Sequence, residues 1–146
     1  MSLEIINHKF LDYQIDESKI LKILDTIFQT EQGSFDKILI ILENDEYLKK
    51  LKNQFFNQNI YTDVISFNLE DSGSSIDGEI YISLPRVIDN ASQYNSNLND
   101  EFKRIIIHGL LHLVGYDDIT ESDKTYMTNL ENKYIELNPG VIISYE

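Results

Sequence analysis

Hydrophobic residues recur along this chain with two different periods, which predict helices and strands in mixed order. Compact apolar or β-branched runs predict strands at residues 3–6, 37–42, 62–67 and 78–84. Apolar residues at helical spacing and residues suited to a first turn predict helices that begin at Asp16 or Glu17, at Asn44 or Asp45, at Pro85 and at Asp100. A polar helix is predicted from Thr120 to about Leu137, because Thr120 and Asp123 resemble a capping box. Polar segments predict loops or turns at residues 32–34, 57–59 and 71–75.

Strands and helices follow one another without strict alternation, so the predicted fold class is α+β, with one layer of helices packed on a small mixed β-sheet. Residues 1–146 contain no repeat, no linker and no break in composition, which predicts a single domain with its own core. Residues 141–145 are expected to form either a short strand or a loose tail.

The run from Glu101 to Asp118 is apolar nearly all round, which is typical of a buried helix. Within it, His108 and His112 are four residues apart and therefore share one face of the helix. Two imidazoles on one face can bind one metal ion, and Gly115 can end the helix so that Asp118 supplies a third, oxygen ligand. A lone buried histidine is more often hydrogen-bonded core, but the pair with a downstream carboxylate favours a metal site.

Composition restricts the kind of metal site and the compartment. The chain has no cysteine, which excludes disulfides and thiolate ligands, so nitrogen and oxygen ligands must hold any metal. The lack of cysteine also favours a cytoplasmic protein. No apolar stretch approaches the ~18 residues of a membrane span, and no basic start followed by an apolar core indicates a signal peptide.

The net charge of −13, from 12 basic and 25 acidic residues, argues against nucleic-acid binding through a generally positive surface. It leaves room for a local basic groove. Lys49, Lys50 and Lys52 form the one dense basic cluster, for which a solvated helix face is the ordinary interpretation.

Three protein ligands and an open fourth position are typical of hydrolytic zinc, which lowers the pKa of bound water and polarises the scissile group. The spacing His-x-x-x-His-x-x-Gly-x-x-Asp is shared with one class of zinc peptidase. Those peptidases carry a glutamate as general base directly after the first histidine. Here that residue is Gly109, so a peptidase is disfavoured, and a hydrolase of some other ester or amide stays open.

Three segments together resemble one known family. His108-Gly-Leu-Leu-His112-Leu-Val-Gly115-Tyr116-Asp117-Asp118 resembles the motif His-Gly-x-Leu-His-Leu-x-Gly-Tyr-Asp-His of the YbeY family of metal-dependent endoribonucleases. Residues 62–67 and 78–83 resemble that family's Thr-Asp-Val-Leu-Ser-Phe and Gly-Asp-Ile-x-Ile-Ser, and the resemblance covers roughly residues 36–135.

The resemblance implies an α+β fold with a zinc ion in a cleft, held by His108, His112 and Asp118. It also implies hydrolysis of single-stranded or ribosomal RNA by a metal-activated water, a role in rRNA maturation and ribosome quality control, and association with the ribosome and its assembly factors. The runner-up interpretation is a ribosome-assembly binding protein that retains the fold and the metal but has little or no nuclease activity.

This chain departs from the family in its third metal ligand, which is usually a histidine and here is Asp118. A carboxylate makes zinc a weaker Lewis acid and shifts the preference toward harder ions such as Mn²⁺. We therefore expect one Zn²⁺ per chain, with Mn²⁺ or Ni²⁺ as alternatives. Asp117 is the alternative ligand. Asp117 and Glu79 are the candidate general bases, whereas Asp63 is expected to cap its strand or to form hydrogen bonds with the backbone around it.

The second departure concerns an arginine that the family usually carries six residues before the threonine of the Thr-Asp-Val block, where it is thought to contact RNA phosphate. Here that position is Phe56, which cannot bind phosphate. Arg104, one helical turn before His108, and Arg86 are the candidate catalytic replacements, and Lys50 and Lys52 are further options. Structural ion pairs are the ordinary interpretation of both arginines.

Overall fold

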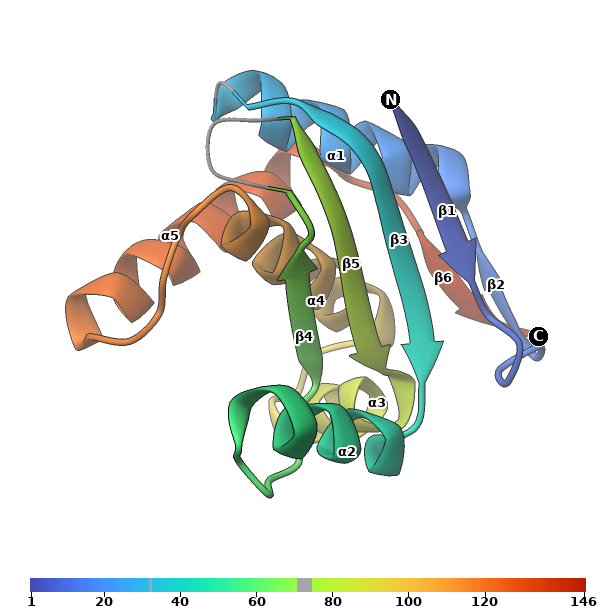
Figure 1. The fold of residues 1–146 in the computed structure, drawn as a ribbon. Helices are drawn as coiled ribbons and strands as arrows, with labels where there is room; N and C mark the ends of the chain where they lie inside the picture. The colour runs from blue at the N-terminus through green and yellow to red at the C-terminus, as the bar shows by residue number, and fades with distance from the viewer. Residues whose placement is uncertain (32, 71–74) are drawn as a thin grey trace.

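The computed structural model describes residues 1–31, 33–70 and 75–146 (Figure 1). Its main sheet has the strand order β1-β3-β5-β4. The strands are β1 (Ser2–Ile6), β3 (Phe35–Glu43), β5 (Ile76–Ser83) and β4 (Val64–Asn68). Strands β1, β3 and β5 are parallel, whereas β4 is antiparallel to β5, so the predicted mixed sheet and α+β class are confirmed.

A second, smaller sheet pairs β2 (Tyr13–Ile15) with β6 (Ile143–Tyr145) in antiparallel register. The C-terminal segment therefore forms a strand, one of the two alternatives expected for it, and its partner strand was not predicted. The turn expected at residues 71–75 and the helix end expected at residue 32 lie largely outside the described residues.

Five helices occupy the described part of the chain, and each has a polar N-cap side chain that accepts a hydrogen bond from a backbone N–H of the first turn. They are α1 (Glu17–Thr30), α2 (Asp45–Phe56), α3 (Leu84–Gln93), α4 (Leu98–Leu113) and α5 (Glu121–Leu137). The histidine-bearing α4 begins two residues earlier than expected because Asn97, rather than Asp100, caps it. No helix of the described residues is long and apolar enough to cross a membrane.

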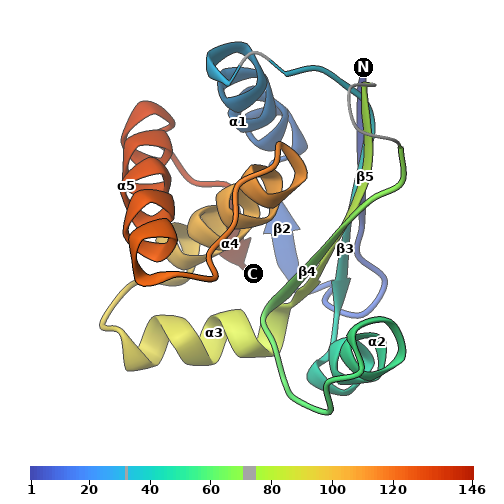
Figure 2. The same cartoon turned by 60° about the vertical axis from the view of Figure 1, so that its left-hand side comes forward.

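The helices do not form a single layer. Figure 2 shows α1, α4 and α5 on one side of the sheet. On β5, Ile80 faces Gly109 of α4, whereas the next residue, Tyr81, stacks with Tyr47 of α2. Successive strand residues point to opposite faces, so α2 covers part of the face that α4 leaves free. The expectation of one helical layer was therefore incomplete, because it did not place α2.

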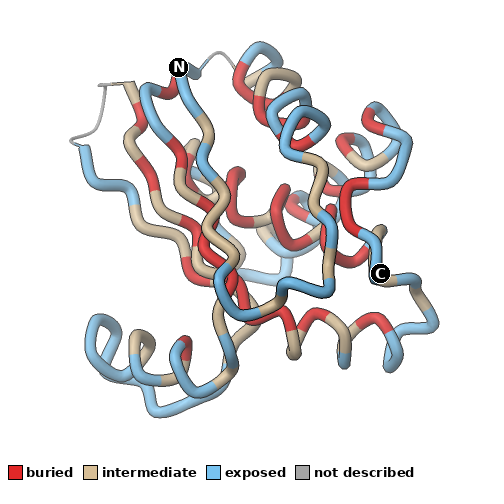
Figure 3. Tube along the Cα trace, turned by 90° about the vertical axis from the view of Figure 1, so that its right-hand side faces the viewer, coloured by how far each residue is buried: buried red, intermediate tan, exposed pale blue. Residues whose placement is uncertain are grey.

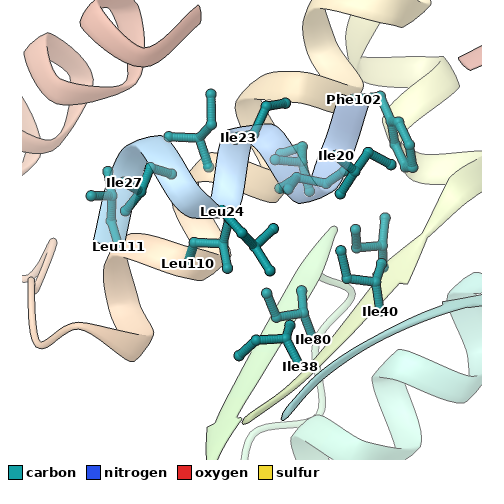
Figure 4. Packing of buried hydrophobic residues seen from close by; sticks show 14 of the residues in the cluster. Ile20, Ile23, Leu24, Ile27, Ile38, Ile40, Ile80, Phe102, Leu110 and Leu111 are labelled. Atoms are coloured by element: carbon teal, nitrogen blue, oxygen red, sulfur yellow. The ribbon is translucent and has the colours of Figure 1, made fainter. Parts of the chain in front are cut away.

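The core lies between the sheet, α1 and α4 (Figure 4). The buried side chains at its centre are Ile20, Ile23, Leu24, Ile27, Ile38, Ile40, Ile80, Phe102, Leu110 and Leu111. Burying each such side chain contributes about 1.5–3 kcal/mol, so α4 is firmly held at the centre of the fold. Figure 3 shows buried segments along the strands and the helices that face them, whereas most of α2 is exposed.

Gly109 sets how closely α4 approaches the sheet. A Cβ atom built there would lie 3.0 Å from both Ile80 Cγ2 and Ser66 Oγ. The Ser66 hydroxyl also donates a hydrogen bond to the Gly109 carbonyl oxygen at 3.0 Å. A glutamate at this position would point into the sheet, so the residue after His108 serves packing and not proton transfer.

Candidate metal centre

The two histidines project from the last turns of α4, and the following turn returns the chain toward them. Gly115 has a φ of +111°, a left-handed conformation that glycine adopts readily. The Tyr116 N–H then donates to the Leu111 carbonyl oxygen at 3.0 Å, which closes the helix end. The tyrosine hydroxyl donates to the Glu31 carboxylate at the end of α1, so the turn is anchored at both backbone and side chain.

This turn brings Asp118 beside both histidines. The Nε2 atoms of His108 and His112 are 3.0 Å apart. Asp118 Oδ2 lies 3.3 Å from Nε2 of His108 and 3.7 Å from Nε2 of His112. Ligand atoms bound tetrahedrally at about 2.0–2.1 Å lie roughly 3.3 Å from one another. The spacing of these three atoms therefore fits one common ion.

The other ring nitrogens show why these two Nε2 atoms need a cation between them. His112 Nδ1 lies 2.9 Å from the Tyr116 carbonyl oxygen, and His108 Nδ1 lies 2.7 Å from Glu131 Oε2. Both oxygens are acceptors, so each Nδ1 carries the proton in the neutral ring. The facing Nε2 atoms then present lone pairs to each other, an arrangement that a metal ion satisfies.

Glu131 of α5 orients the first of these ligands. Glu131 is only 6 % exposed; its Oε1 accepts a hydrogen bond from Arg104 Nη1 at 3.0 Å, and its Oε2 accepts one from His108. Burial lowers the pKa of His108, but the hydrogen bond that it donates to Glu131 and the charges of Glu131, Asp118 and Asp63 outweigh this effect, so the pKa lies above its usual value. This carboxylate–histidine contact is typical of metal-binding histidines.

Sequence reasoning missed Glu131. The signal was the spacing of α5, in which Met127, Glu131 and Tyr134 form one buried face. A glutamate within an apolar stripe must have a partner inside the protein. Nothing local to α5 could indicate that this partner is His108.

The ligand cluster opens into a cavity of about 510 Å³. The cavity is lined by His108, His112 and Asp118 at one end, by residues 62–66 and Asn68 along β4, and by Lys52 and Phe56 of α2. Asp63 is half-buried here and accepts a hydrogen bond from Asn90 Nδ2 at 3.1 Å. Burial raises the pKa of the Asp63 carboxyl above its usual range, against the opposing effect of His108. Such a shifted carboxyl in a cleft is a candidate for proton transfer.

The other predicted site residues lie around this cavity and do not line it. Arg86 binds both carboxylate oxygens of Asp45, at 3.2 Å from Nε and 2.6 Å from Nη2. Arg104 pairs with Glu131 and reaches His108 only through it. Asp117 is exposed and faces a separate shallow pocket beside Tyr116.

Comparisons with known proteins agree with the motifs. The sequence model of the family described as Endoribonuclease YbeY matches residues 5–138. An Endoribonuclease YbeY from Chloroherpeton thalassium is 35 % identical over 133 residues, which cover 91 % of this chain and 94 % of that protein. One from Cytophaga hutchinsonii is 37 % identical over 126 residues, covering 86 % and 88 % respectively.

A solved structure agrees in fold. The solution structure of TM1509 from Thermotoga maritima aligns with a TM-score of 0.60 at 30 % sequence identity, covering 92 % of this chain and 87 % of that one. The resemblance found in the three motifs is thereby confirmed over nearly the whole chain. The chain belongs to the YbeY family of endoribonucleases, which are hydrolases.

Proposed function

We propose that this protein is a metal-dependent endoribonuclease that prefers single-stranded RNA and acts in rRNA maturation and ribosome quality control. The observation that carries the metal dependence is the convergence of two bare Nε2 atoms and one carboxylate oxygen at the end of a cavity. Its volume of about 510 Å³ is in the range of small-ligand sites and suits a short unpaired stretch of RNA.

His108, His112 and Asp118 would hold the ion, which when bound supplies Lewis acidity and lowers the pKa of a coordinated water. Zn²⁺ is the first choice, and the carboxylate of Asp118 makes Mn²⁺ or Ni²⁺ the alternatives. Glu131 holds the His108 ring in orientation, and Arg104 acts as a positioning residue through Glu131.

Asp63 is the residue that we propose as proton acceptor for a water in the cavity. It lines the same cavity as the candidate ligands, and one of its carboxylate oxygens is held by Asn90 Nδ2 at 3.1 Å, which positions the carboxylate to accept a proton. Asp63→Asn should lower kcat by roughly 10²- to 10⁴-fold while metal content stays at the wild-type level. The catalytic roles of Arg86 and Asp117 stay predictions.

We further propose the ribosome and its assembly factors as partners and the cytoplasm as the compartment. The family's endoribonuclease activity supports the partners, and the absence of cysteine supports the compartment.

The decisive experiment combines metal content with RNA cleavage. Wild-type protein, His112→Ala and His8→Ala are purified identically; His8 is exposed and lies outside the cavity, so its variant is the matched control. We expect about one ion per wild-type chain by mass spectrometry, retained in the control and lost in His112→Ala, together with cleavage of a single-stranded RNA. Metal without cleavage would instead support the ribosome-assembly binding protein.

A further inference from the structure

The cavity beside the metal ligands continues to the end of α2, where a cation and an aromatic ring lie together. Lys52 and Phe56 are one helical turn apart, and both line the cavity. Of the basic residues in the described part of the chain, Lys52 is the only one that lines it. The remaining lining carries no side chain that could bind a phosphate by charge or stack a base by a large ring, except the histidines of the metal cluster.

The Phe56 ring is held in place yet accessible. One side of it stacks on Phe67, with centroids 5.9 Å apart and planes at 18°. Phe67 is in turn fixed by edge contacts to Tyr81 and Phe55. Asn57, in a left-handed conformation, ends α2 directly after Phe56. Phe56 is nevertheless 45 % exposed, so it offers a fixed aromatic surface in the cavity wall.

Lys52 has its charge available. Its Nζ lies over the Phe56 ring, 4.7 Å from the ring centroid, and within residues 1–31, 33–70 and 75–146 it forms no ion pair. A base that stacks on this face of the ring would displace the ammonium, which can then reach a neighbouring phosphate. By contrast, Arg86 and Arg104 are bound to Asp45 and Glu131. In a chain with a net charge of −13, an unpaired ammonium lining a cavity is well suited to an anionic ligand.

We propose that Lys52 and Phe56 form a nucleotide subsite that stacks an unpaired base of the RNA on Phe56 and binds a neighbouring phosphate through Lys52. This inference rests on the proposed function, because it takes the scissile phosphodiester to lie at the His108, His112 and Asp118 end of the same cavity. Stacking on an aromatic ring and phosphate pairing are the two contacts that single strands make with sequence-tolerant proteins.

The subsite also accounts for a preference between RNA forms. Both faces of a base inside a duplex are covered by neighbouring bases, so a paired base cannot stack on Phe56. An unpaired base can be turned out and stacked. A single aromatic surface beside the reacting end therefore selects single strands without reading their sequence.

The subsite is tested by binding, independently of cleavage. The probe is a short single-stranded oligodeoxynucleotide carrying 2-aminopurine, which an endoribonuclease leaves intact and whose fluorescence falls on stacking. The variants are Phe56→Leu, Phe56→Trp and Lys52→Gln. The matched controls are Tyr145→Leu, at an exposed aromatic residue of β6, and Lys50→Gln, at an exposed position of α2; neither residue lines the cavity.

We expect wild-type protein to quench the probe and Phe56→Leu to raise Kd roughly 5- to 150-fold, as for the loss of one base–aromatic stack. Phe56→Trp should retain quenching. Lys52→Gln should reduce the slope of log Kd against log salt concentration by about the amount expected for one phosphate contact. The Kd of both controls should stay within about twofold of the wild-type value. Circular dichroism checks that each variant is folded.

Absence of quenching by wild-type protein, or equal losses in Phe56→Leu and Tyr145→Leu, would overturn the subsite. RNA cleavage measured in parallel separates this from failure of the proposed function. Normal RNA cleavage with an unchanged KM in Phe56→Leu would contradict only the proposed subsite. If quenching depends on Phe56 but the protein cleaves no RNA with any added metal, only the proposed nuclease activity would be contradicted.

Discussion

Glu131 accepts a hydrogen bond from Nδ1 of His108 at 2.7 Å, and through this contact α5 sets the orientation of a metal ligand on α4. The contact spans 23 positions of sequence and joins two helices that pack side by side. Because the carboxylate is buried, its charge acts on the imidazole with little screening by water. It fixes the ring tautomer that leaves Nε2 free.

Removing this carboxylate should weaken metal binding without abolishing it. Glu131→Ala is expected to lower metal affinity about 10- to 100-fold, the usual effect of losing the hydrogen-bond partner of a metal-binding histidine. Competition with a chromophoric chelator measures the Kd for Zn²⁺. Glu136→Gln, an exposed site on the same helix, is the control. An unchanged Kd in Glu131→Ala would show that the ring is held by its packing alone.

Exchanging the third ligand should change the metal preference. Asp118→His replaces an oxygen ligand by an imidazole, so we expect the ratio of Zn²⁺ to Mn²⁺ affinity to rise by roughly tenfold or more. Titration of both ions into metal-free protein gives this ratio. Asp117→His serves as the comparison because Asp117 is exposed and faces another pocket. The opposite pattern, with the ratio moved only by Asp117→His, would make Asp117 the ligand.

Adding a methyl group at Gly109 should destabilise the protein. On an exposed helix, exchange of glycine for alanine stabilises by about 1 kcal/mol. Here the new Cβ would lie 3.0 Å from Ile80 Cγ2 and Ser66 Oγ, so overpacking should cost about 1–3 kcal/mol and reverse the sign. Urea unfolding of Gly109→Ala measures whether the free energy of unfolding falls or rises. A gain in the free energy of unfolding would mean that α4 can move away from the sheet freely.

Glu101 should make stability depend on pH. Burial, and to a lesser extent the charges of Asp63 and Glu131, raise the pKa of its carboxyl against the opposing charge of Arg104. The folded state therefore binds more protons than the unfolded state between the two pKa values, and stability falls as the pH rises through that window. Above it, the cost of the buried charge is fully present.

Glu101→Gln removes that charge and keeps the shape. We expect the variant to have a higher free energy of unfolding than wild type at pH 7.5 and about the same value below pH ~4, where the glutamate is protonated in both states. Urea titrations at the two pH values measure the difference. A loss of stability at pH 7.5 would show that the attraction between Glu101 and Arg104 outweighs burial.

Local signals in the sequence predicted the metal cluster and most of the elements. His108 and His112 share a face by helical spacing, Gly115 allows the turn, and Thr120 with Asp123 forms the capping box that was expected. These features depend on residues a few positions apart, for which the geometry of the local backbone determines which side chains come into contact.

What the sequence did not reveal depends on contacts between distant segments. Tyr13 of β2 pairs with Tyr145 of β6, although the two residues lie near opposite ends of the sequence. A strand of three residues is too short for its sequence pattern to indicate which strand it pairs with. The position of α2 is equally nonlocal, because Phe56 is placed by its stacking on Phe67. The same holds for Arg86, whose charge is neutralised by Asp45 at the start of α2.

All three candidate metal ligands lie within residues 108–118, whereas most of the remaining cavity wall comes from residues 62–68 and the end of α2. The candidate metal ligands and the proposed nucleotide subsite are thus encoded in separate stretches of the gene. Substitutions at the end of α2 can alter which nucleic acid is accepted while leaving the candidate metal ligands unchanged. A substitution such as the phenylalanine at position 56 can therefore arise and be selected without loss of the residues that would bind the ion.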